Sequence, residues 1–171
     1  KQMAETHLKL LQAQIEPHFL YNTLANILSL METDSGQARA MLTDLSRYLR
    51  ATLARTRQTS ATIGQEMAVV QSYVDIYRRR MGDRLICRVA VPDHLQSHPF
   101  PPLVVQPLVE NAIRHGIEPL IDGGEITVQV EEADGKLRVR VMDTGRGITG
   151  GAHPDGGLGL ANIRERLEAI Y

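Results

Sequence analysis

The sequence lacks several features that would place the chain in other classes of protein. It holds one cysteine, Cys87, among 171 residues, which excludes an internal disulfide and fits a reducing compartment. It has no apolar run of about 18 residues, so we expect neither a transmembrane helix nor a signal peptide. The formal net charge is -1, which gives no electrostatic footprint for nucleic acid or for an anionic membrane surface. These absences favour a cytoplasmic protein with no nucleic-acid partner.

The length and the first residues indicate a piece of a larger protein. A chain of 171 residues with 43% hydrophobic residues can bury one core, or one core plus a helical appendage. It opens on Lys1 rather than methionine, and residues 1–15 already have the pattern of a mid-helix segment. We therefore expect a fragment of a longer protein, and any membrane segment would lie upstream of Lys1.

The first sixty residues have the periodicity of two long helices. Residues 2–32 are predicted to form one helix, kinked at Pro17 because proline removes a backbone donor and crowds the preceding turn. Residues 33–36 supply turn chemistry, and residues 37–57 predict a second helix. Its expected apolar face consists of Leu42, Leu45, Leu49 and Leu53. Such an antiparallel hairpin has too small a core alone, so we expect two copies to pair into a four-helix bundle, which makes the protein a homodimer.

The rest of the chain changes from helical to mixed periodicity, with the boundary near residues 58–64. Thr62 and Gln65 have the spacing of a capping box, and they predict a third helix that ends at Gly82. The elements expected after it are a strand at 85–91, a helix at 103–115 closed by Gly116, hairpin strands at 125–132 and 136–142 around Asp134-Gly135, a glycine-rich loop at 145–159 and a last helix from Leu160. The fold class is therefore α+β, with one domain over 1–60 and a second over 61–171.

One histidine in the first helix has no place in its apolar stripe. The residues expected to be buried there recur at helical spacing and are Leu20, Leu24, Ile27, Leu28 and Met31. His18 lies well away from that stripe, and Asn22, four residues on, should lie beside it. A lone histidine on a helix is most often structural or simply exposed, so its meaning depends on the rest of the chain.

A second polar cluster lies in the helix predicted at 103–115. Asn111, Arg114 and His115 fall at i, i+3 and i+4, on one face of an α-helix. An amide oxygen and two cationic donors suit a magnesium-bound polyphosphate, because Mg²⁺ keeps most of its waters and the cations meet phosphate oxygens. A solvated helix end, with His115 favourable at the helix dipole, is the alternative.

Two glycine-containing segments follow. The first runs from Asp143 through Gly145 to Gly147 at the end of a strand, where a carboxylate can accept a hydrogen bond from an exocyclic amine and glycines admit a ring closely. The second, Gly156 to Leu160, precedes a helix, so its backbone N–H groups could cradle phosphates. Each is weak alone and compatible with ordinary loops. The P-loop pattern GxxxxGK[ST] does not occur in the chain.

Taken together and in this order, the segments resemble a known ATP site. Asn111 in ENAIRHG, Asp143-x-Gly145-x-Gly147 and Gly157-x-Gly159 resemble the N box and two glycine boxes of the Bergerat-type site of histidine kinases, gyrase and Hsp90. The segment PHFLYN around His18 is similar to the phosphoacceptor helix of the LytS-type sensor histidine kinases. The third helix, with its conspicuous Glu66, Tyr73 and Arg80, resembles the connecting segment of that branch.

The resemblance implies a fold, an activity and partners. The fold would be a Bergerat-type α/β sandwich behind the helical hairpin, with its C-terminal strands missing from this chain. The cofactors would be ATP and Mg²⁺, with adenine at Asp143, magnesium at Asn111, and phosphates near Arg114 and His115. The loop that contains Gly157, Leu158 and Gly159 would cover the phosphates. The γ-phosphoryl group would pass to His18 and then to an aspartate of a response-regulator receiver domain.

Two departures from the family pattern bear on the chemistry. Gyrase and Hsp90 have a water-activating glutamate four residues before the motif asparagine, where this chain has Pro107, and Glu110 is the only local carboxylate that could substitute. Many histidine kinases have an acidic residue directly after the phosphoacceptor, where this chain has Phe19. The proton acceptor of His18 therefore stays open. Asn22 could orient a water that dephosphorylates the partner.

Two other functions remain alternatives at this point. One is a Bergerat-type ATPase that drives a conformational switch, which Pro107 and the His18 helix disfavour. The other is a degenerate nucleotide-binding scaffold that serves dimerisation only.

Overall fold

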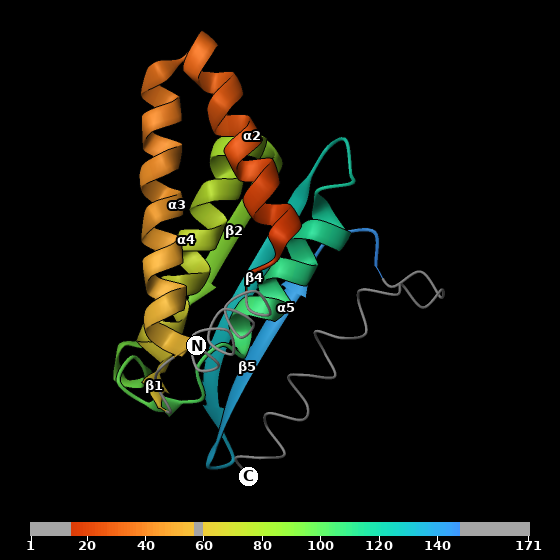
Figure 1. Ribbon diagram of the computed structural model, residues 1–171. Helices are drawn as coiled ribbons and strands as arrows, with labels where there is room; N and C mark the ends of the chain where they lie inside the picture. The colour runs from red at the N-terminus through yellow and green to blue at the C-terminus, as the bar shows by residue number, and fades with distance from the viewer. Residues whose placement is uncertain (1–14, 57–59, 148–171) are drawn as a thin grey trace. The chain divides into compact units, whose positions relative to one another are not determined.

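The computed structural model describes residues 15–56 and 60–147 (Figure 1). The chain divides into two compact units, Lys1–Gln58 and Thr59–Tyr171, and each is described by itself. The mixture of helices and sheet confirms the α+β class. No helix within the described ranges combines the length and the apolar character needed to span a bilayer.

The first unit is a hairpin of two helices, α2 (Pro17–Thr33) and α3 (Ser35–Thr56), which run in opposite directions side by side (Figure 1). Only Asp34 separates them. Its backbone N–H donates to the Leu30 carbonyl, and its Oδ1 accepts a 2.9 Å hydrogen bond from the N–H of Gln37. One residue therefore ends α2 and satisfies an otherwise free donor at the start of α3.

Pro17 begins α2 instead of kinking a longer helix. Glu16, directly before it, has extended backbone angles (φ -62°, ψ 119°), so the interruption predicted at Pro17 is present as a helix start and not as a kink. The reason is that the first helical position needs no N–H donor and suits the fixed φ of proline. Residues 2–14 of the predicted helix lie outside the described residues.

The core of the hairpin shares Ile27 with the predicted stripe of α2 but otherwise uses other residues. Phe19, Thr23 and Ile27 are buried, and the Phe19 ring meets Tyr48 of α3 edge-on with 5.5 Å between centroids. By contrast, Leu28 and Met31 keep 65% and 62% of their surface exposed. The prediction that these residues are buried is therefore wrong for the single chain.

The second helix shows the same division of its apolar residues. Leu45 of α3 is buried as predicted, whereas Leu42 and Leu53 are exposed. Periodicity identifies apolar residues that need cover, but it does not say which surface supplies the cover. Both helices thus leave apolar side chains on the surface of the described hairpin.

The second unit consists of one long helix, several short helices and two small sheets. Its elements are β1 (Ala61–Thr62), α4 (Ile63–Met81), η1 (Gly82–Arg84), β2 (Leu85–Ala90), η2 (Asp93–Leu95), β3 (Pro99–Phe100), α5 (Val105–Asn111), the π-helix η3 (Ala112–Ile117), β4 (Gly124–Ala133) and β5 (Lys136–Asp143). β1 pairs antiparallel with β3, which joins the start of α4 to the chain before α5.

The main sheet has the order β2-β4-β5, with β2 parallel and β5 antiparallel to β4. Alternate residues of β4 are buried, namely Ile126, Val128 and Val130. The register places Val141 opposite Val128 and Asp143 opposite Ile126. Because side chains alternate along a strand, Asp143 shares the face of the buried valines at the very end of β5.

The other face of this sheet is polar. Arg88 of β2 pairs with Glu125 at 2.5 Å, and Glu131 of β4 pairs with Arg138 and Arg140 of β5 at 3.2 and 3.1 Å. Figure 1 shows α4 and α5 on one side of the sheet. The unit is therefore a two-layer arrangement with helices over the apolar face and solvent on the other.

Two local predictions in this unit are confirmed. Thr62 Oγ1 accepts from the N–H of Gln65, and the Gln65 side chain accepts from the N–H of Thr62, which is a complete capping box. Asp134 and Gly135 both have positive φ (55° and 69°) between β4 and β5, as a tight hairpin turn requires.

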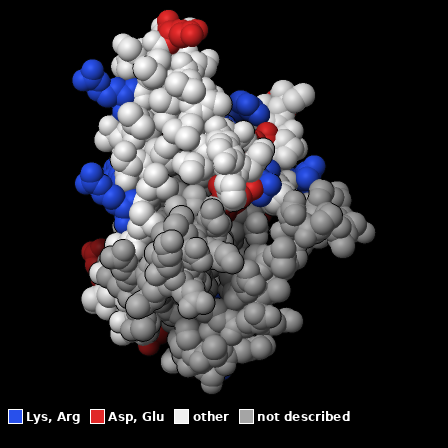
Figure 2. Space-filling model, in the orientation of Figure 1, with Lys and Arg blue, Asp and Glu red and all other residues white. Residues whose placement is uncertain are grey.

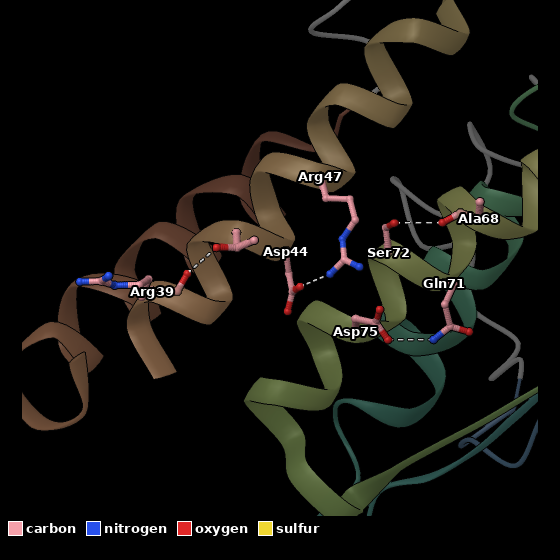
Figure 3. A network of polar contacts seen from close by, with 8 residues as sticks. Arg39, Asp44, Arg47, Ala68, Gln71, Ser72 and Asp75 are labelled. Atoms are coloured by element: carbon pink, nitrogen blue, oxygen red, sulfur yellow. Dashed lines mark hydrogen bonds and ion pairs between the residues drawn. The ribbon is translucent and has the colours of Figure 1, made fainter. Parts of the chain in front are cut away.

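Polar side chains on the long helices bond mostly within their own helix. Figure 3 shows this for Arg47 and Asp44 of α3, and for Gln71 and Asp75 of α4. Ser72 Oγ likewise donates to the Ala68 carbonyl at 2.9 Å. These contacts support the helices locally and do not fix one element against another.

Candidate functional site

His18 is exposed in the first turn of α2, next to the buried Phe19. Asn22 Nδ2 lies 3.3 Å from its Nδ1 and 3.2 Å from its Nε2, so the amide sits against the imidazole as the i,i+4 spacing predicts. The burial of Phe19 against Tyr48 fixes this turn and leaves the histidine pointing away from the core. The structure therefore offers an accessible imidazole with a polar neighbour.

The second cluster lies where α5 becomes the π-helix η3. Asn111 is the last residue of α5, and Arg114 and His115 follow within η3, all three half-buried. Glu110 Oε1 accepts a 2.7 Å hydrogen bond from Gln106 Nε2 one turn earlier. The carboxylate considered as a possible base is thus already engaged by a neighbour.

The π-helix bears on two expectations. The N–H of Glu118 donates to the Ile113 carbonyl five residues back, which widens the turn beyond α-helical geometry. The prediction that Asn111, Arg114 and His115 share one face rests on α-helical spacing, whereas Arg114 and His115 lie in a π-helix. Gly116 does not close the helix, because it lies inside η3, which continues to Ile117.

Gly116 instead makes a close contact with the strand end. A Cβ on Gly145 would lie 2.5 Å from the Gly116 Cα, and a Cβ on Gly116 would lie 2.9 Å from Asp143 Oδ1. The N–H of Arg146 donates to the Gly116 carbonyl at 3.1 Å. The Asn111 segment and the Asp143 segment are therefore joined backbone to backbone, which only glycine allows at this distance.

Asp143 is exposed at the end of β5. Its Oδ1 accepts a 2.9 Å hydrogen bond from the N–H of Gly145, which fixes the carboxylate. The N–H of Thr144 donates to the Glu125 carbonyl at 3.0 Å, and the N–H of Glu125 donates to Thr144 Oγ1 at 2.9 Å. Gly147 has a φ of 70°, in the region that favours glycine. The strand end is rigid and presents one carboxylate to solvent.

The third predicted segment, with Gly157, Leu158 and Gly159, lies outside the described residues. The description of the site therefore covers the Asn111 and Asp143 segments only.

The donor set fits a metal that arrives with its substrate. Within residues 15–56 and 60–147, no three His, Cys, Asp or Glu side chains come together as a metal site. Asn111 offers one amide oxygen, which suits Mg²⁺ because this ion keeps several waters and takes its remaining ligands from phosphates. The described residues thus fit a nucleotide-borne magnesium ion better than a resident one.

The charge distribution gives no competing site on the face drawn in Figure 2. Lys and Arg side chains lie there in small separate groups between uncharged residues, within the part of the surface that the structure describes. The surface of α2 is largely uncharged, because Glu32 is the only Asp, Glu, Lys or Arg in that helix.

The sequence analysis did not predict the roles of two residues that are important to this arrangement. Glu66 of α4 is completely buried and bonds to backbone amides at the start of α5. Gly116 was expected only as a helix end. For Glu66 a signal exists in the sequence: a carboxylate stands among apolar residues of a helix, and the segment before Val105 lacks a capping side chain.

Comparisons with known proteins identify the class. The family described as histidine kinase matches residues 6–85, and the family of histidine kinase-, DNA gyrase B- and HSP90-like ATPases matches residues 99–170. The chain therefore belongs with the histidine kinases and carries an ATPase region of this type after its kinase region.

Relatives narrow the class further. Over 183 residues the chain is 32% identical to the sensor protein LytS of Oceanobacillus iheyensis. This match covers 99% of the chain and 31% of the relative. It is 34% identical over 175 residues to the sensor histidine kinase YpdA of Escherichia coli (98% of the chain, 31% of the relative). It is 35% identical over 174 residues to the sensor histidine kinase YesM of Bacillus subtilis (98% and 30%). The chain is of the LytS type, and it spans about a third of the length of these curated relatives.

Proposed function

We propose that the chain is the kinase core of a two-component sensor, which binds Mg-ATP, phosphorylates itself on His18 and passes the phosphoryl group to an aspartate of a response regulator. The observation that carries this proposal is the joining of the Asn111 and Asp143 segments at Gly116 and Gly145, in a chain that also presents an exposed His18. The order of the two family matches supports it.

The chemistry asked of His18 is nucleophilic attack on the γ-phosphorus. A bond forms between a ring nitrogen and phosphorus, the bond to the β–γ bridging oxygen breaks, ADP leaves, and the imidazole gives up a proton. Asn22, whose amide nitrogen lies within 3.3 Å of both ring nitrogens, would restrict the movement of the ring. The position of His18 in the first turn of α2 also helps, because the partial positive charge of a helix start favours the phosphate that is gained.

The ATP site would use the two joined segments and the loop after them. Asp143 would accept a hydrogen bond from the adenine amine, and Asn111 would hold magnesium, which neutralises phosphate charge in the transition state. Arg114 and His115 would contact phosphate oxygens, and Gly157 to Gly159 would cover them. Catalysis of this kind is mainly positioning, so the rigidity of the Gly116–Gly145 contact matters more than any acid or base.

The exposed apolar residues of the hairpin support a homodimer. Leu24, Leu28 and Met31 of α2 and Leu42 of α3 remain on the surface of the described chain. A second hairpin would cover them in a four-helix bundle. In this proposal residues 1–60 serve dimerisation and phosphoacceptance, and residues 61–171 serve ATP binding, on the cytoplasmic side of a membrane sensor.

Incubation of the purified chain with γ-labelled ATP and magnesium tests the proposal. We expect label on the protein that is acid-labile and base-stable, and that is lost in His18→Gln and on chelation of magnesium. Asn22→Ala should keep the label at a lower rate.

The same experiment separates the alternatives. Free phosphate without labelled protein would indicate an ATPase switch, and bound ATP with neither product would indicate a scaffold. A receiver domain added after labelling should remove the label from His18.

A further inference from the structure

Glu66 of α4 is a buried charge with a complete set of partners. Its side chain is fully buried, with an exposed fraction of 0%. It lies in the first turn of α4, where most of the other buried residues are apolar. A buried carboxylate is costly unless it is paired or hydrogen-bonded. No Lys, Arg or His is recorded as its partner among the described residues, and its hydrogen bonds all come from backbone.

Those hydrogen bonds cap another helix. Oε2 accepts from the N–H of Leu103 at 2.9 Å, and Oε1 accepts from the N–H groups of Val104, Val105 and Gln106 at 2.8, 2.9 and 3.4 Å. These amides belong to the start of α5, where the first N–H groups have no partner within the helix. The local cap position is Val104, whose side chain makes no hydrogen bond to the helix. Glu66 therefore supplies from α4 the cap that α5 lacks.

The backbone at this point needs such support. Leu103 has a φ of 60°, in the left-handed region that a leucine rarely adopts. Its N–H is one of the donors to Glu66. A strained conformation persists only where its surroundings hold it, and the carboxylate is the group that holds this one.

From the cap, a short rigid path leads to the proposed metal ligand. α5 has seven residues, so Asn111 at its end lies about 10 Å from its start along the helix axis. Gln106, bonded to Glu66 through its N–H, also bonds through its side chain to Glu110, the neighbour of Asn111. A shift of the helix start therefore moves Asn111 with it.

α4 also holds the far end of the same segment. Arg80 pairs with Glu118 just after η3 and lies over the Tyr77 ring at 4.7 Å, and Arg84 Nη2 donates to the Leu120 carbonyl at 2.6 Å. The segment from Leu103 to Leu120 includes Asn111. It is thus attached to α4 at its start, and to α4 and η1 at its far end.

We propose that Glu66 is a positioning residue for Mg-ATP: by capping α5 from α4, it sets the position of Asn111 and so the binding of magnesium with the nucleotide. This inference rests on the proposed function. It adds that the position of the metal ligand is set by α4, the next helix after α3 among the described residues, and not by the loop before α5.

The test compares nucleotide affinity with and without magnesium in Glu66→Gln. This variant keeps the size of the side chain but turns an NH2 group toward backbone donors. We expect the gain in ATP affinity on adding magnesium, measured by calorimetry in Mg²⁺ and in EDTA, to fall by about tenfold or more. The affinity in EDTA should fall by a smaller factor than the magnesium gain, because it depends on Asp143, at a strand end that Glu66 does not contact, as well as on Arg114 and His115.

Hydrogen exchange gives a second readout that does not depend on activity. The amides of Leu103 to Gln106 should lose protection in Glu66→Gln, whereas those of β4 should keep it. Ser72→Ala is the matched control, because its hydroxyl bonds only within α4, and it should change neither measurement. If Glu66→Ala does not fold, the glutamine variant still decides.

The outcomes distinguish this inference from the proposed function. An unchanged magnesium gain in Glu66→Gln, or equal losses in Mg²⁺ and EDTA, overturns the positioning role while the wild type still labels His18. A wild-type chain that binds ATP no better with magnesium overturns both.

Discussion

Gly116 and Gly145 hold the candidate site together because neither has a side chain. The two backbones approach so closely that a single methyl group on Gly145 would meet Gly116 at 2.5 Å. The carboxylate of Asp143 lies at the same contact, fixed by the N–H of Gly145. At this scale the site depends on the absence of atoms as much as on the polar groups present.

Gly145→Ala should therefore weaken ATP binding more than it weakens the fold. The added Cβ forces the strand end away from η3 and displaces Asp143, and we expect a loss of about tenfold or more in affinity. Calorimetric titration with Mg-ATP measures it. Gly135→Asn, in the hairpin turn, is the control, because asparagine tolerates the positive φ there. ATP affinity equal to wild type in Gly145→Ala would contradict this account.

Cys87 provides a pH-dependent prediction at the residue scale. Burial raises the pKa of the Cys87 thiol above its ordinary value, and Arg78 offsets this only in part. The folded state thus holds the thiol proton more tightly than the unfolded state does. The resulting stability is present below the ordinary thiol pKa and is lost as the pH rises through the raised value.

Alkylation with iodoacetamide across pH 7 to 10 measures this directly. The pH at which the alkylation rate is half-maximal should be higher in the folded chain than in the same chain unfolded in urea. In urea this pH should be about 8.5. A folded midpoint at or below the unfolded one would disprove the assignment.

At the scale of elements, α2 carries more apolar surface than α3 covers. Phe19, Thr23 and Ile27 are buried, while Leu24, Leu28 and Met31 remain exposed on the described hairpin. An apolar stripe wider than its contact is expected where a helix packs against more than one neighbour.

Leu28→Glu should therefore dissociate the proposed dimer without unfolding the hairpin. Each dimer would bury this side chain twice, at roughly 1.5–3 kcal/mol each, so the dimer Kd should rise by at least about 100-fold. Sedimentation equilibrium gives the Kd, and circular dichroism reports the helices. Ser29→Glu, an equally exposed neighbour on the polar side, should leave the Kd nearly unchanged. A wild-type chain that is monomeric at micromolar concentration would refute the bundle.

At the scale of the whole molecule, the proposed reaction needs a group from each unit: the imidazole from the first and the nucleotide from the second. Pro107 occupies the position at which the related ATPases have a water-activating glutamate. Glu110 is bonded to Gln106. The described residues thus offer no activated path to water, which favours His18 as the proposed acceptor.

His18→Gln should therefore bind Mg-ATP like the wild type but release almost no phosphate. Because this variant has no general base to activate water, its rate of phosphate release should be lower by about 100-fold or more than the wild-type rate. The wild type forms phosphate through turnover of phosphohistidine. A coupled phosphate assay on the two chains measures it. Steady release from His18→Gln at the wild-type rate would instead favour the ATPase switch.

The sequence by itself determined the features that depend on neighbouring residues. The capping box of Thr62 and Gln65, the turn at Asp134-Gly135, the three strands and the contact of His18 with Asn22 all follow from local spacing. Order and spacing of the motifs also determined the class, which the comparisons confirm. Short-range hydrogen bonds and periodicity are properties of a segment, so a segment reveals them.

Only the tertiary structure decided what depends on contacts between distant segments. It turned Gly116 from a helix end into a contact with Gly145 and left Leu28 exposed. It also gave Glu66 its partners, 37 to 40 residues away in sequence. The sequence marks Glu66 as a carboxylate among apolar residues and α5 as a helix without a capping side chain, but a backbone amide is chemically the same at every position, so only the fold shows that these two meet.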